Sequence, residues 1–243
     1  MTLLATYETY GSSVLVGDAL VTIAGSPSSL RKKVYIVGPN LVIGWTGYLR
    51  TARVVVFELL SRFWDKHVDI SSLESTLCNL NFDGMSEFNV KIVGSIVDTQ
   101  PRSFIWQSSY PKEVFYNDYY FEGSGEKYFE SVLKFHILSG GDPPRPQHKF
   151  SNEVAAAQST LVYCGQAFFD EVLAFENWTQ TFGFAYEVLV YAYGKFWPLG
   201  PNSVCGLGIP MGPNNRNRTR DTVAIHRENE LSPALLYLAK GYP

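Results

Sequence analysis

Cysteine is scarce in this chain, and a disulfide framework is not expected. The 243 residues contain three cysteines, at positions 78, 164 and 205. An odd number of thiols at such wide spacings is unlike the paired cysteines of small secreted domains. The N-terminal stretch also lacks the basic segment and the cleavage site of a signal peptide. We therefore expect a cytoplasmic protein.

Patterns that bind metals, cofactors or membranes are missing as well. The four histidines stand apart, without His-x-x-x-His spacing, so we expect no metal site. The glycine-rich stretch 206–212 is not followed by the helix start of a dinucleotide fingerprint, so we expect no cofactor. No apolar run approaches the roughly 18 to 20 residues that a membrane-spanning helix needs. We expect no membrane partner.

Positive charge is not in excess either. The chain has 20 Lys and Arg against 23 Asp and Glu, which gives a net charge of -3. Nucleic-acid binding needs a clustered surplus of cations. The one arginine-rich segment, 214–220, is soon followed by Asp221 and Glu228. We therefore expect no nucleic-acid partner.

Apolar and aromatic residues are plentiful. They make up 46% and 15% of the chain, which predicts a sizeable core. Aromatic rings at this frequency also favour contacts between subunits. We find no internal repeat and no sharp domain boundary. The prediction is a single domain over 1–243, with a C-terminal extension of unassigned structure from about 198.

Strand-like and helix-like segments alternate along the chain. Short β-branched runs between turn residues predict three groups of strands, within 2–47, 88–122 and 184–197. Apolar residues at helical spacing predict helices over 48–65, 71–80, 124–138 and 151–178. This order favours two antiparallel sheets that face each other, with helices on both outer faces. We therefore predict an α+β fold, a four-layer αββα sandwich.

Two of these helices have candidate caps. Ser71, Ser72 and Glu74 resemble a capping box at the start of the helix that reaches about residue 80. Ser124 is a candidate N-cap for the helix that follows it.

Thr2 offers nucleophilic chemistry. A methionine before a small residue such as threonine is commonly removed during synthesis, which would give Thr2 a free α-amine. The hydroxyl of an N-terminal threonine attacks, and the amine, with a pKa of about 8, accepts its proton. A nearby cation keeps that amine neutral and lowers the pKa of the hydroxyl. A lysine at the head of a buried strand, such as the one that begins at Val34, suits this role.

Two stretches resemble the proteasome-type β subunits of the N-terminal nucleophile hydrolases, of the bacterial proteasome-homologue type. The first is 11–60, with "GDALVT", "SSLR" before lysines, and a glycine that ends a strand before a long helix. The second is 90–133, which includes the "GSG" start of a helix. The resemblance covers the chain from Thr2 to about Tyr193 and implies the αββα fold.

The resemblance assigns the catalytic residues. Thr2 matches the nucleophile, and Asp18 matches the acid that orients the lysine. Lys33 matches the lysine, with Lys32 as the second choice and otherwise a solvated charge at a strand end. Ser124 matches the serine near the α-amine. Taken alone, Thr2 also suits a frayed terminus and Asp18 a hairpin turn.

The resemblance also assigns two substrate-binding residues. The backbone of Thr22 would pair with a peptide that adds to the edge of a sheet. The amide of Gly47 would bind the oxyanion of the tetrahedral intermediate. A small residue at position 47 would let the scissile carbonyl approach.

The function implied by the resemblance is a threonine peptidase that forms an acyl-enzyme at Thr2. It would assemble with copies of itself into a ring or another closed oligomer and cleave peptides or unfolded proteins. The alternative is a catalytically degenerate subunit with a structural or binding role. The segment 177–186 favours it, because the family's Asp followed by Ser and two Gly is missing there. A small-molecule amidase on the same fold is a third interpretation.

Overall fold

The structure, a computed structural model, describes most of the first 134 residues and selected parts of the rest. The described residues are 2–23, 26–80, 89–134, 152, 155–157, 159–160, 163–164, 167, 185–198, 204–207 and 222–225.

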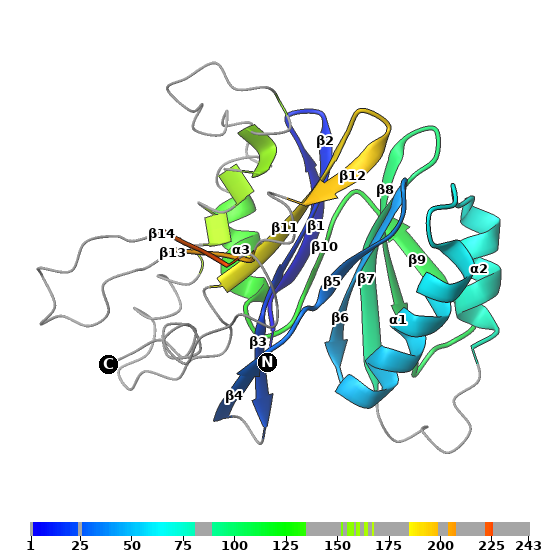
Figure 1. The fold of residues 1–243 in the computed structure, drawn as a ribbon, viewed down its shortest axis with the longest axis horizontal. Coiled ribbons are helices and arrows are strands. Elements are labelled where there is room, and N and C mark those ends of the chain that lie inside the picture. The colour runs from blue at the N-terminus through cyan, green and yellow to red at the C-terminus, as the bar shows by residue number, and fades with distance from the viewer. Residues whose placement is uncertain are drawn as a thin grey trace, which may run out of the picture.

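One antiparallel sheet joins the N-terminus to the C-terminal half of the chain (Figure 1). Its strands run in the order β10-β1-β2-β11-β13-β14, and β12 also pairs with β11. The β1–β2 hairpin turns at Tyr10 and Gly11, which both have positive φ, as a two-residue type I′ turn requires. The strands of this first sheet are β1 (Leu4–Thr9), β2 (Ser12–Asp18), β10 (Tyr120–Glu122), β11 (Ala185–Ala192), β12 (Lys195–Pro198), β13 (Val204–Leu207) and β14 (Thr222–Ile225).

The second antiparallel sheet is a meander of five strands in the order β5-β6-β7-β8-β9. A separate two-stranded ribbon, β3 with β4, precedes it along the chain. These elements are β3 (Leu20–Ile23), β4 (Ser26–Leu30), β5 (Val34–Gly38), β6 (Leu41–Gly47), β7 (Val90–Val97), β8 (Pro101–Gln107) and β9 (Val114–Asn117). The predicted α+β class, with two antiparallel sheets, is confirmed.

Three helices have defined bounds: α1 (Leu49–Phe63), α2 (Ile70–Cys78) and α3 (Glu126–Leu133). They match three of the predicted segments, although 135–138 lies outside the described residues. The described residues between 152 and 167 are helical, as predicted, and the rest of the predicted helix 151–178 is not described.

The predicted cap of α2 is wrong. The N-cap is Asp69, whose carboxylate accepts the backbone N–H of Ser72 at 2.8 Å and the hydroxyls of Ser71 and Ser72. Asp outranks a mid-turn Ser here because its two oxygens accept several donors at once. These three bonds, to the Ser71 hydroxyl first, lower the pKa of Asp69 to about 2.

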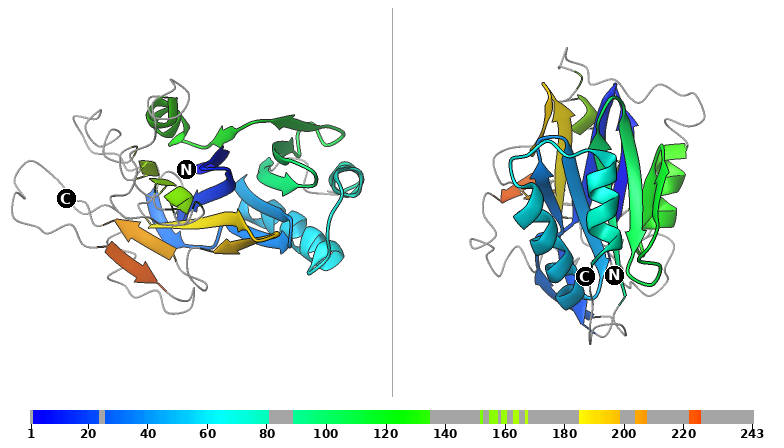
Figure 2. Two further views of the ribbon diagram at one scale, coloured as in Figure 1. Left: turned by 90° about the horizontal axis from the view of Figure 1, so that it is seen from above. Right: turned by 90° about the vertical axis from the view of Figure 1, so that its right-hand side faces the viewer.

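Three hydrophobic clusters hold these elements together. One lies between the two sheets and includes Leu4 and Leu15 from the first sheet and Val42 and Val93 from the second. A second packs α1 and α2 on the other face of the five-stranded sheet. A third packs α3 and buried helical residues such as Tyr163 on the other face of the first sheet. Figure 2 shows these helices on opposite sides of the two sheets.

Among the described helices, none has the length and apolar character needed to cross a membrane.

Candidate active site

The hairpin β1–β2 places Thr2 beside Asp18. Leu4 pairs with Gly17 in this hairpin, so the residues before β1 meet the end of β2. The backbone N–H of Asp18 donates to the Leu3 carbonyl at 3.0 Å and continues the ladder. Thr2 is buried, with 2% of its surface exposed, and is not a frayed terminus.

Asp18 binds this start of the chain through a single carboxylate oxygen. The Thr2 hydroxyl donates to Asp18 Oδ1 at 2.7 Å, and the Leu3 N–H donates to the same oxygen at 2.8 Å. The Asp18 side chain is fully buried. A buried carboxylate is stable only when it is paired and hydrogen-bonded, so a cation is required close by.

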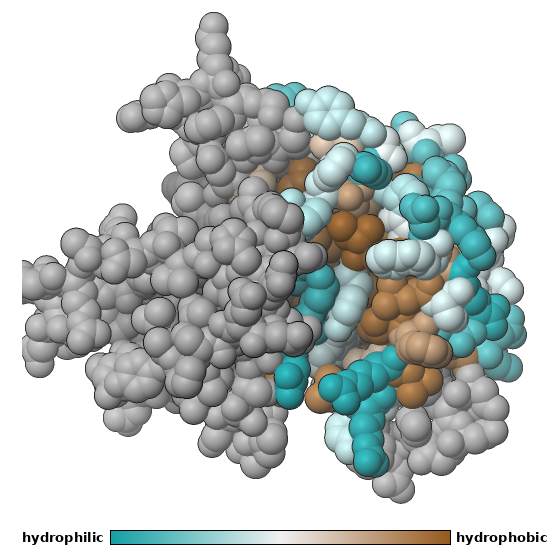
Figure 3. Space-filling view, in the orientation of Figure 1, coloured by the Kyte–Doolittle hydropathy of each residue, from teal (hydrophilic) through white to brown (hydrophobic). Residues whose placement is uncertain are grey.

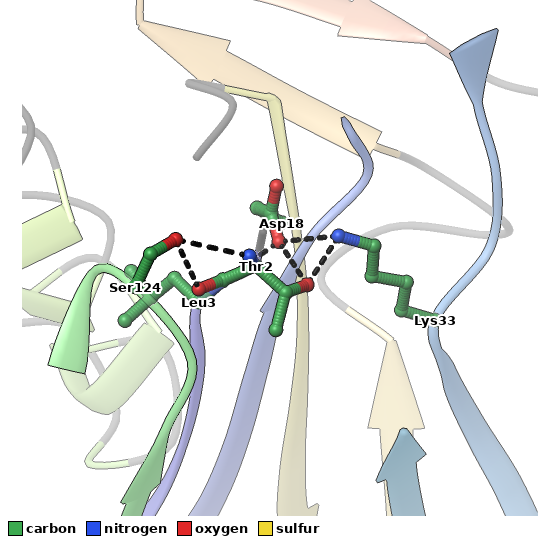
Figure 4. A network of polar contacts seen from close by, with 5 residues as sticks. All are labelled: Thr2, Leu3, Asp18, Lys33 and Ser124. Carbon is green, nitrogen blue, oxygen red and sulfur yellow. Dashed lines mark hydrogen bonds and ion pairs between the residues drawn. The ribbon is translucent and has the colours of Figure 1, made fainter. Parts of the chain in front are cut away.

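Lys33 supplies that cation. It lies just before β5, and its Nζ donates to Asp18 Oδ1 at 2.8 Å and to the Thr2 hydroxyl oxygen (Figure 4). The lysine side chain is 3% exposed. Burial lowers the pKa of Lys33, while the charge of Asp18 and its hydrogen bond act in the opposite direction. The three side chains therefore form one buried hydrogen-bonded triangle.

Ser124 contacts Thr2 on the other side. The Thr2 backbone nitrogen donates to Ser124 Oγ at 3.2 Å, and Ser124 Oγ donates to the Thr2 carbonyl at 3.4 Å. The prediction of Ser124 as a helix cap is wrong, because the N-cap of α3 is Gly125 and no side chain caps it. The serine is instead directed to Thr2.

Gly123 allows this close approach. Its φ is +99°, and an added Cβ would lie 2.1 Å from the Thr2 carbonyl oxygen. Any side chain here would displace Thr2 from Ser124. The importance of Gly123 was missed from the sequence, although it is the first glycine of the "GSG" motif that indicated Ser124.

Gly47 ends β6 and is exposed. Its φ is +103°, and an added Cβ would lie 2.3 Å from the carbonyl oxygen of Asn89. The structure therefore supplies a local reason for glycine at this position. The predicted reason, the approach of a substrate carbonyl, remains a proposal.

Thr22 lies on β3, opposite Pro27 of β4. In the described part of the chain β3 pairs only with β4, and its other edge has no strand partner there. An extended peptide can add to a strand edge of this kind.

Lys32 is not the solvated charge that the sequence suggested. Its Nζ lies 2.9 Å from Glu187 Oε1, and its side chain is 31% exposed. Glu187 was missed from the sequence, although a single acid in the otherwise apolar run 184–192 is the signal that could have shown it. Lys33, and not Lys32, contacts Thr2.

One predicted feature lies outside the described residues. The segment 177–184, where the family's Asp and Ser would lie, is not described. Within the described ranges, no group of three or more His, Cys, Asp or Glu residues could hold a metal ion. No protein-family model matches this chain, and no curated protein sequence matches it.

Proposed function

We propose that this chain is a threonine peptidase of the N-terminal nucleophile type, similar to proteasome β subunits. The observation that carries this proposal is the buried triangle of Thr2, Asp18 and Lys33. It combines a hydroxyl nucleophile with a lysine that touches it and an acid that orients the lysine.

The proposed reaction starts with removal of Met1, which gives Thr2 an α-amine. The Lys33 ammonium stabilises negative charge on the Thr2 oxygen and disfavours protonation of the amine. Thr2 Oγ1 attacks the peptide carbonyl carbon, and its proton passes to the α-amine, which Ser124 orients. The C–N bond breaks, the proton goes to the leaving amine, and an ester to Thr2 remains. Water hydrolyses this ester and restores the hydroxyl.

The four-layer αββα arrangement belongs to the proposal. It is supported by the three hydrophobic clusters, one between the sheets and one on each outer face.

The proposal also includes a closed homo-oligomer that acts on peptides or unfolded protein in the cytoplasm. Exposed aromatic side chains, such as Phe57 at 73% and Trp64 at 67% exposure, are typical of subunit contacts. Cys78 and Cys164 are free thiols, consistent with a reducing compartment.

The proposal is tested by intact mass and by covalent labelling. Purified protein is expected to lack Met1 and to gain one adduct on treatment with a peptide epoxyketone, located at Thr2 by peptide mapping. The Thr2→Ala variant is the control and should gain none. Processed protein without an adduct would reject the enzyme, and retained Met1 would support the degenerate subunit.

A groove of about 590 Å³ is lined by residues of β5, β6, α1 and the segment before β5. Its lining includes Lys32, the chain neighbour of Lys33, and Trp45, whose N–H donates to the Lys33 carbonyl at 3.1 Å. Figure 3 shows hydrophobic surface here, bordered by hydrophilic side chains. A substrate side chain next to the cleaved bond would enter this groove.

The charges of the groove favour an acidic side chain. Its charged lining residues are Arg31, Lys32, Arg53 and Glu58. Lys32 is paired with Glu187 at 2.9 Å, and Glu58 is paired with Arg62 at 2.5 Å. Among the described residues neither arginine of the lining has an ion-pair partner, so two guanidinium groups remain to bind a carboxylate.

We predict that peptides with Glu before the cleaved bond are preferred over peptides with Gln. Substitution of Arg31 or Arg53 by Gln should reduce this preference about tenfold, the effect of one charge-assisted hydrogen bond. The measurement is kcat/KM for paired Glu and Gln peptides. Arg50→Gln, an exposed arginine of α1 outside the groove, is the matched control. Equal kcat/KM values for the two peptides in the unsubstituted protein would contradict the prediction.

A further inference from the structure

The helix α1 has apolar side chains on two faces. On one face Ala52, Val55 and Leu59 are buried against the second sheet. Elsewhere on the helix Val54 and Phe57 have 36% and 73% of their surface exposed. Both line the groove of about 590 Å³, and Figure 3 shows its hydrophobic surface. Exposed apolar side chains that gather in a groove indicate a binding surface.

The charge of this groove limits which occupant fits it. Arg31 and Arg53 belong to the lining, and among the described residues neither has an ion-pair partner. A guanidinium group binds a carboxylate through two parallel hydrogen bonds. An occupant with carboxylates next to apolar side chains therefore complements both the charge and the hydrophobic surface of the groove.

Residues 226–243, which follow the last described strand, have this combination in their sequence. Glu228 and Glu230 come first. The run 231–239 comes next, and no Asp, Glu, Lys or Arg interrupts it. Its leucines are Leu231, Leu235, Leu236 and Leu238.

The pairing of the last strands brings the start of this segment near the groove. Cys205 of β13 lies opposite Ala224 of β14 and also opposite Tyr186 of β11. Two strand spacings, roughly 10 Å, therefore separate Ala224 from Tyr186. The residue after Tyr186 is Glu187, whose Oε1 lies 2.9 Å from Nζ of Lys32 in the groove lining.

The segment is long enough to reach the groove within one chain. An extended residue spans about 3.3 Å, so Glu228 and Glu230 can lie up to roughly 10 and 17 Å from Ile225. By the same spacing, residue 239 can lie up to about 46 Å away. The chain can therefore supply the occupant of its own groove.

We infer that segment 228–239 docks in the groove beside α1 of the same chain. Its two glutamates lie beside the two arginines of the lining, and its leucines cover the exposed apolar side chains of α1. Trp64 is outside this lining and stays exposed for contacts between subunits. The proposed peptidase receives a substrate side chain in this groove, so the docked segment competes with substrate. That consequence rests on the proposed function, whereas the docking does not.

Photo-crosslinking of the full chain tests the docking and does not depend on activity. With Phe57 replaced by the photoreactive residue p-benzoylphenylalanine, irradiation is expected to join position 57 to a peptide within 228–239, in a product of one-chain mass. The same replacement at Tyr110, a 67%-exposed residue between β8 and β9, is the control and should not join this segment. Replacement at Val54, also in the lining, decides the question if the Phe57 variant does not fold.

Removal of the carboxylates tests the charge pairing. In the double variant Glu228→Gln, Glu230→Gln, the ratio of crosslinked to free chain should fall about tenfold, the effect of losing one charge-assisted hydrogen bond. Glu130→Gln, which removes an exposed carboxylate of α3, is the control and should leave the ratio unchanged. Equal ratios in the double variant and in the unsubstituted chain would overturn the pairing of glutamates with arginines.

The double variant Leu235→Asp, Leu236→Asp tests the competition with substrate. Charge within the apolar run should release the segment from the groove and abolish the crosslink. We expect kcat/KM for a Glu peptide to rise severalfold, with kcat unchanged, because the segment and the substrate compete for one groove.

The outcomes separate this inference from the proposed function. A crosslink to another segment, no crosslink, or a product of two-chain mass would overturn docking within the chain. If the unsubstituted protein forms no epoxyketone adduct, the peptidase proposal fails, and the crosslink still decides the docking. If the adduct forms without the crosslink, the docking fails and the peptidase proposal stands. A crosslink with unchanged kcat/KM in Leu235→Asp, Leu236→Asp would show that the docked segment does not compete with substrate.

Discussion

Replacement of Thr2 by alanine is expected to lower the rate of peptide cleavage about a thousandfold or more. The hydroxyl is the only group of Thr2 that can form the acyl-enzyme, and it is the atom that Lys33 and Asp18 both contact. Loss of a nucleophile removes the covalent route entirely and leaves only the binding of substrate. The measurement is kcat/KM with a fluorogenic peptide, on protein whose Met1 has been removed.

Thr2→Ser is the matched control, since serine keeps the hydroxyl and omits only the methyl group. It should retain measurable cleavage and should still form the epoxyketone adduct. Cleavage by Thr2→Ala at the rate of the unsubstituted protein would show that another residue attacks the substrate.

Substitution of Asp18 by asparagine is expected to destabilise the fold by about 3–5 kcal/mol, the usual cost of breaking a buried ion pair by removing one partner. The Lys33 side chain is only 3% exposed, so its ammonium would be left buried without a counter-charge. Asp18 acts to raise the pKa of Lys33, so its loss should lower that pKa further and favour the neutral amine. Peptide cleavage should fall as well, because the neutral amide oxygen of Asn accepts from the Lys33 ammonium more weakly than the carboxylate and holds it less firmly beside Thr2. Urea unfolding measures the change in stability.

Glu130→Gln serves as the comparison for this variant. Its ion pair with Lys134 is exposed, with side-chain exposures of 32% and 54%, and such pairs contribute about 0–1 kcal/mol. If Asp18→Asn and Glu130→Gln had equal urea midpoints, the buried triangle would contribute nothing to the stability of the fold.

The relation between Thr2 and Asp18 was predictable because it is local. A tight hairpin joins β1 to β2, and its register brings residue 2 beside a residue 16 positions later. Alternating apolar runs and a glycine in the turn are enough to indicate such a hairpin. Tyr10 with Gly11 forms the turn, and the two serines that follow belong to β2.

Which of Lys32 and Lys33 faces the site depends on residues distant in the chain. Consecutive residues point to opposite sides, so the sequence indicated a lysine for the site without showing which side chain faces it. The arrangement of the first sheet settles the choice, since Asp18 and Glu187 lie on opposite faces of paired strands. The solvated state predicted for Lys32 was wrong because its partner lies on a strand far along the chain.

The resemblance assigned Asp18 as the acid. Local patterns specified the hairpin, the three helices with defined bounds, the α+β class and Thr2 as the candidate nucleophile. They depend on short-range spacing and backbone geometry, which are written in neighbouring residues. The tie from Lys32 to Glu187, the approach of Ser124 to Thr2 beside Gly123, and the burial that lowers the pKa of Lys33 arise from segments distant in the chain. Folding brings these segments together, and no spacing along the chain encodes their contact.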